Sequence, residues 1–205
     1  NPLHTALATA GVVLGFPTID SEMRDPALRA FVEQLGRNEG LPVVVDPGIV
    51  NPEDFLNEVL DVRFPNRYLP DDPARIAMDT SQKVGIRFGE TIKAYLANEE
   101  LDVKNLKLIP LVFAGWLRYL LGLNDELRPF TPSPDPRLAE VQASLVDIKM
   151  GMQGPFPSLE SLLSDTTLWG VDLNAIGMAE LVKTYFAQLL AGRGAVRETL
   201  CKYVH

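Results

Sequence analysis

The sequence predicts an all-α fold, arranged as one multi-helix domain over residues 1–205. Apolar residues recur at helical spacing in most of the chain, as they do on the buried face of an amphipathic helix. A capping residue directly precedes proline at Asp25, Asn51 and Asp72, and this pair is typical of a helix start. No stretch alternates strands with helices, which argues against a mixed α/β fold.

These patterns define roughly eight to ten helices with no repeat at a fixed period. In chain order, we expect helices at residues 3–15, 21–34, 52–62, 73–78, 81–98, 106–121, 138–152, 158–163, 173–191 and from 195 toward the end of the chain. A chain of this length can bury a full core.

In the first part of the chain, glycine and proline mark where helices pack and end. Gly11 and Gly15 leave room for a close helix contact within the first helix. Phe16-Pro17 ends that helix, and Asp25-Pro26 makes a fresh start inside the second. Residues 41–45 contain a valine run flanked by prolines, which we interpret as an extended connection or an edge strand.

In the remainder of the chain, one helix is predicted to form the centre of the core. Residues 106–121 are apolar on nearly every side, so we expect other helices to pack around them. A proline-rich loop follows at residues 128–136, and Pro155-Phe156-Pro157 separates two later helices. Gly192-Arg193-Gly194 follows a helix and is interpreted as its C-terminal cap and turn.

Composition excludes several classes of function. A net charge of −8 argues against a nucleic-acid surface, which requires a basic stripe. Two histidines at opposite ends of the chain and one cysteine, Cys201, provide no metal-ligand spacing, so we expect no metal. The charge-free apolar run at residues 108–117 is too short to cross a bilayer. The single cysteine and the lack of a signal-peptide pattern favour a cytoplasmic location.

The sequence lacks a dinucleotide-binding motif of its own. Such a motif needs a strand, a glycine-rich turn and a helix, in that order. The nearest glycine cluster, at residues 192–194, follows a helix and lacks the third glycine. The sequence also begins with Asn1, inside a helical pattern, and we therefore expect that a preceding part of the protein is missing.

Two basic residues flank a predicted break between helices. Asp79, Thr80 and Ser81 are cap-type residues that can close one helix and open the next. On an unbroken helix, Arg75 and Lys83 would lie about 12 Å apart along the axis and about 80° apart around it. A break near Asp79 would bring both heads to one place, where they suit an anionic or polyhydroxylated small molecule. The alternative interpretation is that both are ordinary surface cations.

Several polar residues around this break keep a fixed register. They are Arg63-Phe64-Pro65-Asn66, Asp71-Asp72, Arg75 and Asp79-x-Ser81-x-Lys83. The set resembles a signature of the polyol-specific long-chain dehydrogenases, which include mannitol 2-dehydrogenase, fructuronate (mannonate) reductase and tagaturonate reductase. The resemblance covers nearly the whole chain and implies the helical C-terminal domain of a two-domain enzyme, with a fold like the C-terminal domain of 6-phosphogluconate dehydrogenase. It also implies that Arg75 and Lys83 line a sugar site.

The first residues extend the resemblance. Family members carry a lysine, an asparagine and a histidine on one helix, and Asn1-Pro2-Leu3-His4 supplies the asparagine and the histidine. The lysine, which in the family moves the hydroxyl proton, would lie just upstream of residue 1. The resemblance implies that Asn1 and His4 are catalytic and hydrogen-bond the reacting oxygen. The alternatives are that His4 is a solvated histidine and that Asn1 belongs to an expression scar.

The resemblance implies an NAD(P)-dependent oxidoreductase that interconverts a keto-sugar or ketohexuronate and its polyol or aldonate. Residues 80–91 look more like the fructuronate reductases, which favours fructuronate and mannonate. Arg87, four residues after Lys83, is a further candidate cation for a carboxylate, or else a surface residue. NAD or NADP would be bound mainly by an N-terminal Rossmann domain outside this chain. Two alternatives stay open: a mannitol 2-dehydrogenase, and a non-catalytic helical interaction module.

Overall fold

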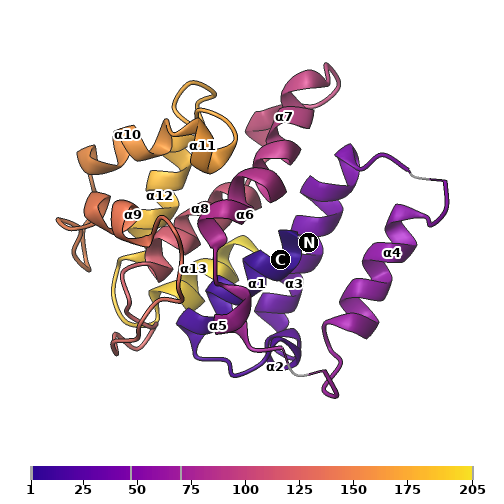
Figure 1. Cartoon of the computed structure of the whole chain (residues 1–205), viewed down its shortest axis with the longest axis horizontal. Coiled ribbons are helices and arrows are strands. Elements are labelled where there is room, and N and C mark those ends of the chain that lie inside the picture. The colour runs from indigo at the N-terminus through magenta and orange to yellow at the C-terminus, as the bar shows by residue number, and fades with distance from the viewer. Residues whose placement is uncertain (1, 47, 70, 205) are drawn as a thin grey trace.

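The computed structural model describes residues 2–46, 48–69 and 71–204, which form helices joined by turns and loops (Figure 1). The all-α prediction is confirmed, because these ranges contain no strand. The α-helices are α1 (Pro2–Leu14), α2 (Ile19–Met23), α3 (Pro26–Gln34), α4 (Pro52–Glu58), α5 (Pro73–Ile76), α6 (Thr80–Val84), α7 (Glu90–Ala97), α8 (Leu108–Tyr119), α9 (Leu138–Ser144), α10 (Glu160–Leu163), α11 (Thr166–Trp169), α12 (Ala179–Leu189) and α13 (Ala195–Tyr203).

Several helices continue through a turn of different pitch. π-helical turns at Leu35–Gly40 and Val59–Arg63 extend α3 and α4, and a third at Gly85–Gly89 joins α6 to α7. The helix predicted at residues 81–98 therefore exists as one rod with a wide turn in its middle. The edge strand is wrong: Leu41–Val43 form a 3₁₀ turn, and the chain becomes extended only at Val44.

Glycines allow the rod to lie directly against the backbone of α11. A Cβ on Gly85 would lie 2.7 Å from the carbonyl oxygen of Leu168, and a Cβ on Gly89 would overlap that of Trp169. A side chain is excluded at both positions because the atoms it would meet belong to the backbone of the α11 segment and cannot move aside. Arg87 lies between these two glycines, on a segment fixed by backbone contact.

The helix α8 forms the centre of the core, as its apolar sequence predicts. Every residue from Leu108 to Tyr119 except Gly115 is buried, and α12 packs alongside. Around it, aromatic rings meet in tilted and edge-on arrangements, which rings prefer. Trp169 lies 5.6 Å from Trp116 and 4.7 Å from Phe113, measured between ring centroids.

A buried carboxylate closes the first turn of α8. Oε1 of Glu39 accepts hydrogen bonds from the N–H groups of Lys107 and Leu108, both at 2.6 Å, and Oε2 accepts from Ile109 at 2.8 Å. Burial raises the pKa of Glu39, although the three N–H groups act in the opposite direction. The start of the core helix therefore depends on a side chain from the turn after α3.

A second buried carboxyl lies where α1 meets α2. A Cβ on Gly11 would overlap Oε1 of Glu22, so the predicted close contact at Gly11 is confirmed. Gly15 has open space around it and ends α1 at φ 82°, which is a different role from the one predicted. Glu22 is fully buried, and neither of its oxygens has a hydrogen-bond partner in the described part of the chain. Burial raises the pKa of Glu22 to about 9, so its carboxyl is protonated at neutral pH.

Two helices in the C-terminal half are shorter than predicted. The helix expected over residues 138–152 ends at Ser144, and turns carry the later apolar residues to the core. Gly151 pins those turns to the end of α12, because its N–H group donates to the carbonyl of Leu190 at 2.6 Å. The helix expected from residue 173 begins only at α12, because Gly177 has a φ of 75° and interrupts the helical path.

Candidate functional site

The candidate site begins in the first turn of α1. His4 is mostly buried, and its ring stacks on that of Phe64 at 5.0 Å between centroids. Its Nε2 lies 3.6 Å from a carboxylate oxygen of Asp71. The predicted catalytic residue Asn1 lies outside the described residues.

His4 is a neutral imidazole at physiological pH. Burial lowers its pKa to about 4, and the positive charges of Arg87 and Arg75 add to that effect, whereas Asp71 opposes it. A neutral ring has one N–H donor and one acceptor nitrogen, so it can exchange hydrogen bonds with a hydroxyl or a carbonyl. The alternative of a solvated His4 is therefore wrong.

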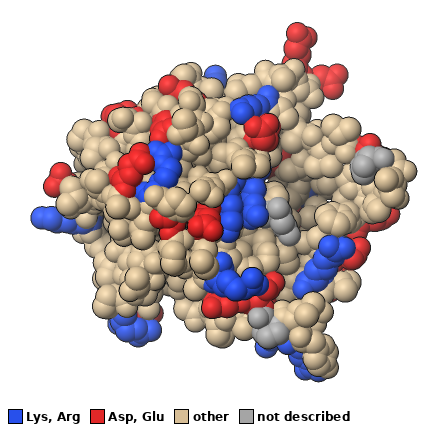
Figure 2. All heavy atoms as spheres, in the orientation of Figure 1, with Lys and Arg blue, Asp and Glu red and all other residues tan. Residues whose placement is uncertain are grey.

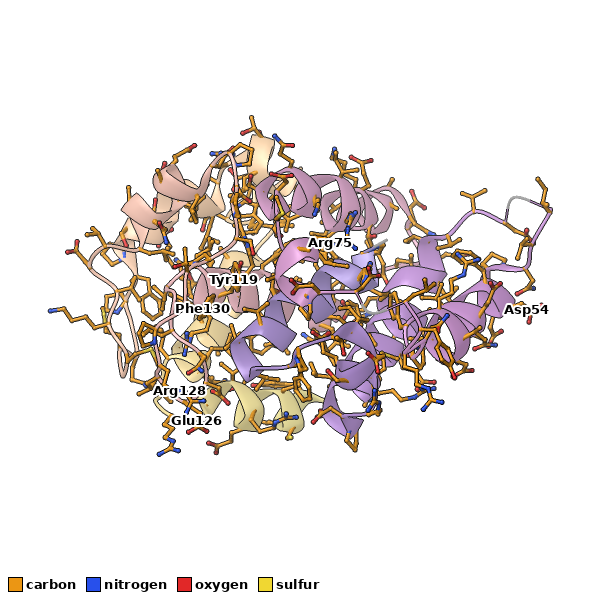
Figure 3. All side chains as sticks on the ribbon, turned by 60° about the horizontal axis from the view of Figure 1, so that its bottom comes forward. Asp54, Arg75, Tyr119, Glu126, Arg128 and Phe130 are labelled. Atoms are coloured by element: carbon orange, nitrogen blue, oxygen red, sulfur yellow. The ribbon has the colours of Figure 1, made fainter. Side chains whose placement is uncertain are left out.

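Arg75 projects from a short helix that packs against α1 (Figure 3). The start of α5 is as predicted: Asp72 caps the N–H of Ala74 at 2.8 Å, and Pro73 is the first helical residue. Nη2 of Arg75 donates to Asp71 at 2.5 Å, although 66% of the arginine side chain is exposed. Asp71 thus lies between an imidazole and a guanidinium.

The predicted break near Asp79 is confirmed, but its mechanism differs from the one expected. The Asp79 side chain makes no capping hydrogen bond, and its backbone adopts the left-handed conformation at φ 53°. Thr80 Oγ1 donates back to the carbonyl of Ala77 at 2.8 Å, and the N–H of Ser81 is capped by Asp135 from a distant loop. The helix therefore breaks at Asp79 through the backbone conformation of that residue and through hydrogen bonds from the Asp135 loop.

The break turns Lys83 back toward α5. Its Nζ donates to the carbonyls of Ile76, at 2.9 Å, and Met78, which lie at and just after the C-terminal end of that helix. Burial lowers the pKa of Lys83, followed in effect by the charge of Arg87. Lys83 forms no ion pair with any carboxylate in the described residues.

Arg87 reaches from the π-helical turn to α1. Its Nη1 donates to Oγ1 of Thr5, the residue after His4, and burial lowers its pKa. Arg87 is half-buried, so it lies at the surface while its guanidinium contacts α1. His4, Arg75, Lys83 and Arg87 therefore form one neighbourhood, called the cation cluster below, in which each charge influences others. Figure 2 shows basic side chains gathered in the middle of this face.

Asp71 contacts two members of the cation cluster, and the sequence assigned it no role. Its position four residues before Arg75 on the approach to α5 was the available signal, since such pairs meet on one face. A separate groove of about 390 Å³ lies beside the start of α1, and apolar residues such as Leu41, Phe55 and Ile109 line it. None of the cation cluster lines that groove.

The described residues contain no group of three or more His, Cys, Asp or Glu side chains that could hold a metal ion. They also contain no helix long and apolar enough to span a bilayer. The glycines of residues 192–194 form the turn between α12 and α13, as predicted, and Gly194 has a φ of 78°. The described part of the chain thus presents no glycine-rich strand-to-helix turn for a dinucleotide.

Comparison with known proteins agrees with the resemblance. The sequence matches the family described as mannitol dehydrogenase C-terminal domain over residues 1–190. It is 52% identical over 201 residues to the D-mannonate oxidoreductase of Thermotoga maritima, a match covering 98% of this chain and 37% of that protein. It is 28% identical to the mannitol 2-dehydrogenase of Neosartorya fischeri, over 100% of this chain and 38% of that protein.

A solved structure shares the fold. The mannitol 2-dehydrogenase of Pseudomonas fluorescens, in a ternary complex with NAD and D-mannitol, superposes with a TM-score of 0.80 at 23% identity. The match covers 98% of this chain and 38% of that one, so the chain spans less than two fifths of the relatives it matches. Because the family match extends over nearly all of the sequence, the chain belongs to the mannitol dehydrogenase C-terminal domain family.

Proposed function

We propose that this chain is the substrate-binding part of an NAD(P)-dependent oxidoreductase that interconverts a ketohexuronate and its aldonate. The observation that carries the proposal is the convergence of a neutral imidazole with three cations from α1, α5 and the α6–α7 rod. The 52% identity with a D-mannonate oxidoreductase supports the same reaction class. A cytoplasmic location suits a chain with one cysteine.

The roles follow from the chemistry of each group. His4, together with Asn1, would hydrogen-bond the oxygen at the reacting carbon, where charge develops as a carbonyl is reduced. Arg75, Lys83 and Arg87 would bind the distal hydroxyls and a carboxylate. A lysine on the preceding part of the α1 helix, outside this chain, would exchange the hydroxyl proton.

The described residues present no dinucleotide-binding motif, and the cofactor would be bound mainly by a separate Rossmann domain. NAD or NADP would supply or accept the hydride. Exposed apolar side chains next to the cation cluster support its being covered by that domain. Tyr68 is 79% exposed and Leu69 70% exposed just before Asp71, and Ile86 is 73% exposed beside Arg87.

A sugar acid suits the cluster better than a neutral polyol. Within the described residues, Nζ of Lys83 contacts two backbone carbonyls and forms no ion pair. A bound carboxylate would be attracted by the positive charges of Lys83 and Arg87, and an arginine can recognise it in bidentate fashion. The second candidate is a mannitol 2-dehydrogenase, favoured by the fold shared with that enzyme. Turnover of fructuronate, tagaturonate, fructose and mannitol by the intact enzyme separates the two.

Arg75→Ala in the intact enzyme is expected to lower kcat/KM at least about tenfold, or some 1.4 kcal/mol, because a charge-assisted contact to substrate is lost. Steady-state kinetics on the substrate with the highest kcat/KM measures the effect. Arg24→Ala is a matched control, since Arg24 is equally exposed and also pairs with an aspartate four residues away. A kcat/KM unchanged from that of the wild-type enzyme would show that Arg75 does not bind the substrate.

The 205-residue chain alone is expected to show no turnover with NADH or NADPH, because its described residues present no dinucleotide-binding motif. Absorbance of the reduced cofactor, followed with fructuronate present, measures the rate. The intact enzyme under the same conditions is the positive control. Oxidation of either cofactor above the buffer background would contradict the assignment of the cofactor to a separate domain. The upstream sequence tests the other alternative: a glycine-rich βαβ half before Asn1 would exclude a non-catalytic helical module.

A further inference from the structure

The helix break at Asp79 is supported by a distant part of the sequence. A non-glycine residue in the left-handed conformation persists where surrounding structure holds it. Here the N–H of Asp79 donates to the carbonyl of Pro134 at 3.0 Å. The neighbouring residues Ser133 and Asp135 make further contacts with the same turn, so residues 133–135 act as a strap across it.

The strap contacts the helix on each side of the break. Before it, Oγ of Ser133 donates to the carbonyl of Ala74 in α5 at 2.6 Å. After it, Oδ2 of Asp135 accepts from the N–H of Ser81 in α6 at 2.7 Å. Ala74 directly precedes Arg75, and Ser81 lies two residues before Lys83. Each contact therefore fixes the backbone next to one member of the cation cluster.

The strap is itself fixed to the core. The N–H of Ser133 donates to the hydroxyl of Tyr119, a fully buried residue at the end of α8, at 2.6 Å. The second carboxylate oxygen of Asp135 accepts from the N–H of Arg137 at 2.9 Å, so both of its oxygens are engaged. The hydrogen bonds form a continuous path from the core helix to the two turns that carry Arg75 and Lys83.

We propose that Ser133 and Asp135 are positioning residues that hold Arg75 and Lys83 in the arrangement that binds substrate. The inference rests on the proposed function. Neither residue needs to touch the ligand, because an error of position at the backbone of Ala74 or Ser81 is carried to the charged head at the end of the neighbouring side chain. Misplacement of a binding group by a small distance is enough to weaken substrate binding.

The test uses the intact enzyme and its best substrate. Asp135→Ala is expected to raise KM about tenfold while kcat changes less than about twofold, because uniform binding is lost and the reacting groups stay in place. Asp135→Asn keeps an acceptor oxygen for Ser81 and is expected to recover most of the affinity. Ser133→Ala, which loses the hydroxyl contact to Ala74, is expected to raise KM about threefold.

Asp102→Ala is the matched control. Asp102 also caps a backbone N–H, that of Lys104 at 2.9 Å, in the loop after α7, which Figure 1 shows far from α5. It is expected to leave KM unchanged. In an Arg75→Ala, Lys83→Ala background, Asp135→Ala is expected to add less than a twofold change in KM, since there is nothing left to position.

The outcomes separate the two levels of the hypothesis. If Arg75→Ala and Lys83→Ala raise KM but Asp135→Ala and Ser133→Ala do not, the positioning role is overturned and the proposed function stands. If none of the four variants alters KM, the proposed function itself is contradicted, and the positioning role falls with it. A lower melting temperature with unchanged KM, or an equal effect of Asp135→Ala with and without the two cations, shows a merely structural strap. If Asp135→Ala does not fold, Asp135→Asn and Ser133→Ala decide.

Discussion

Glu22→Gln is expected to make the 205-residue chain markedly more resistant to unfolding at alkaline pH. The folded-state pKa of Glu22 is raised to about 9, so the folded chain keeps a proton that the unfolded chain releases above its ordinary pKa of 4.5. The stabilising contribution of this group is therefore complete below pH 4.5 and is lost as the pH rises toward 9. Over that range the loss reaches up to about 6 kcal/mol, at some 1.4 kcal/mol for each pH unit.

Urea unfolding at pH 6.5 and pH 9 measures this effect in a range where His4, with a pKa of about 4, stays neutral in the folded state. The wild-type chain is expected to lose about 3 kcal/mol more free energy of unfolding between these two pH values than Glu22→Gln loses. Glu99→Gln removes the same charge from an exposed position and serves as the control. Parallel pH profiles for wild type and Glu22→Gln would show that the carboxyl is not protonated in the fold.

Glu39→Ala is expected to lower the free energy of unfolding by about 3–5 kcal/mol, because three backbone N–H groups at the start of α8 lose their side-chain acceptor. Two of those groups belong to the buried residues Leu108 and Ile109, where burial limits the access of water. Glu39→Gln retains one acceptor oxygen and is expected to lose about half as much.

Chemical denaturation at neutral pH compares the two variants of Glu39 with Asp102→Ala. Asp102 caps one N–H group in an exposed turn, so its removal is expected to cost about 1 kcal/mol or less. A loss below about 1 kcal/mol for Glu39→Ala would mean that another group or water satisfies the helix start.

Signals that act within a few residues explain what the sequence could predict. Asp72 before Pro73 marks the start of α5, and the cap-type residues near Asp79 mark the break, because capping depends on neighbours in the chain. The apolar residues of α8 likewise identify the core helix from its own composition. The cap at Asp165 before Thr166 was a signal of the same kind for α11, and it was overlooked.

Contacts between distant residues explain what the sequence could not predict. Glu39 caps α8 and Asp135 caps α6, and each cap joins residues more than fifty positions apart. No residue near either helix start indicates these caps. The bend of Lys83 back to Ile76 depends on a backbone angle at Asp79 that residue type alone does not determine. The functional roles of His4, Arg75, Lys83 and Arg87 stay predictions until kinetics tests them.

The two glycines of the π-helical turn limit how this site can diversify. Because Gly85 and Gly89 place the rod in backbone contact with α11, the stretch between them cannot shift or rotate to accommodate a larger or smaller ligand. Relatives that retain both glycines would have to change ligand preference by exchanging the side chain at position 87 itself. Under the proposed function, a change of sugar would then require the exchange of single side chains on a fixed backbone.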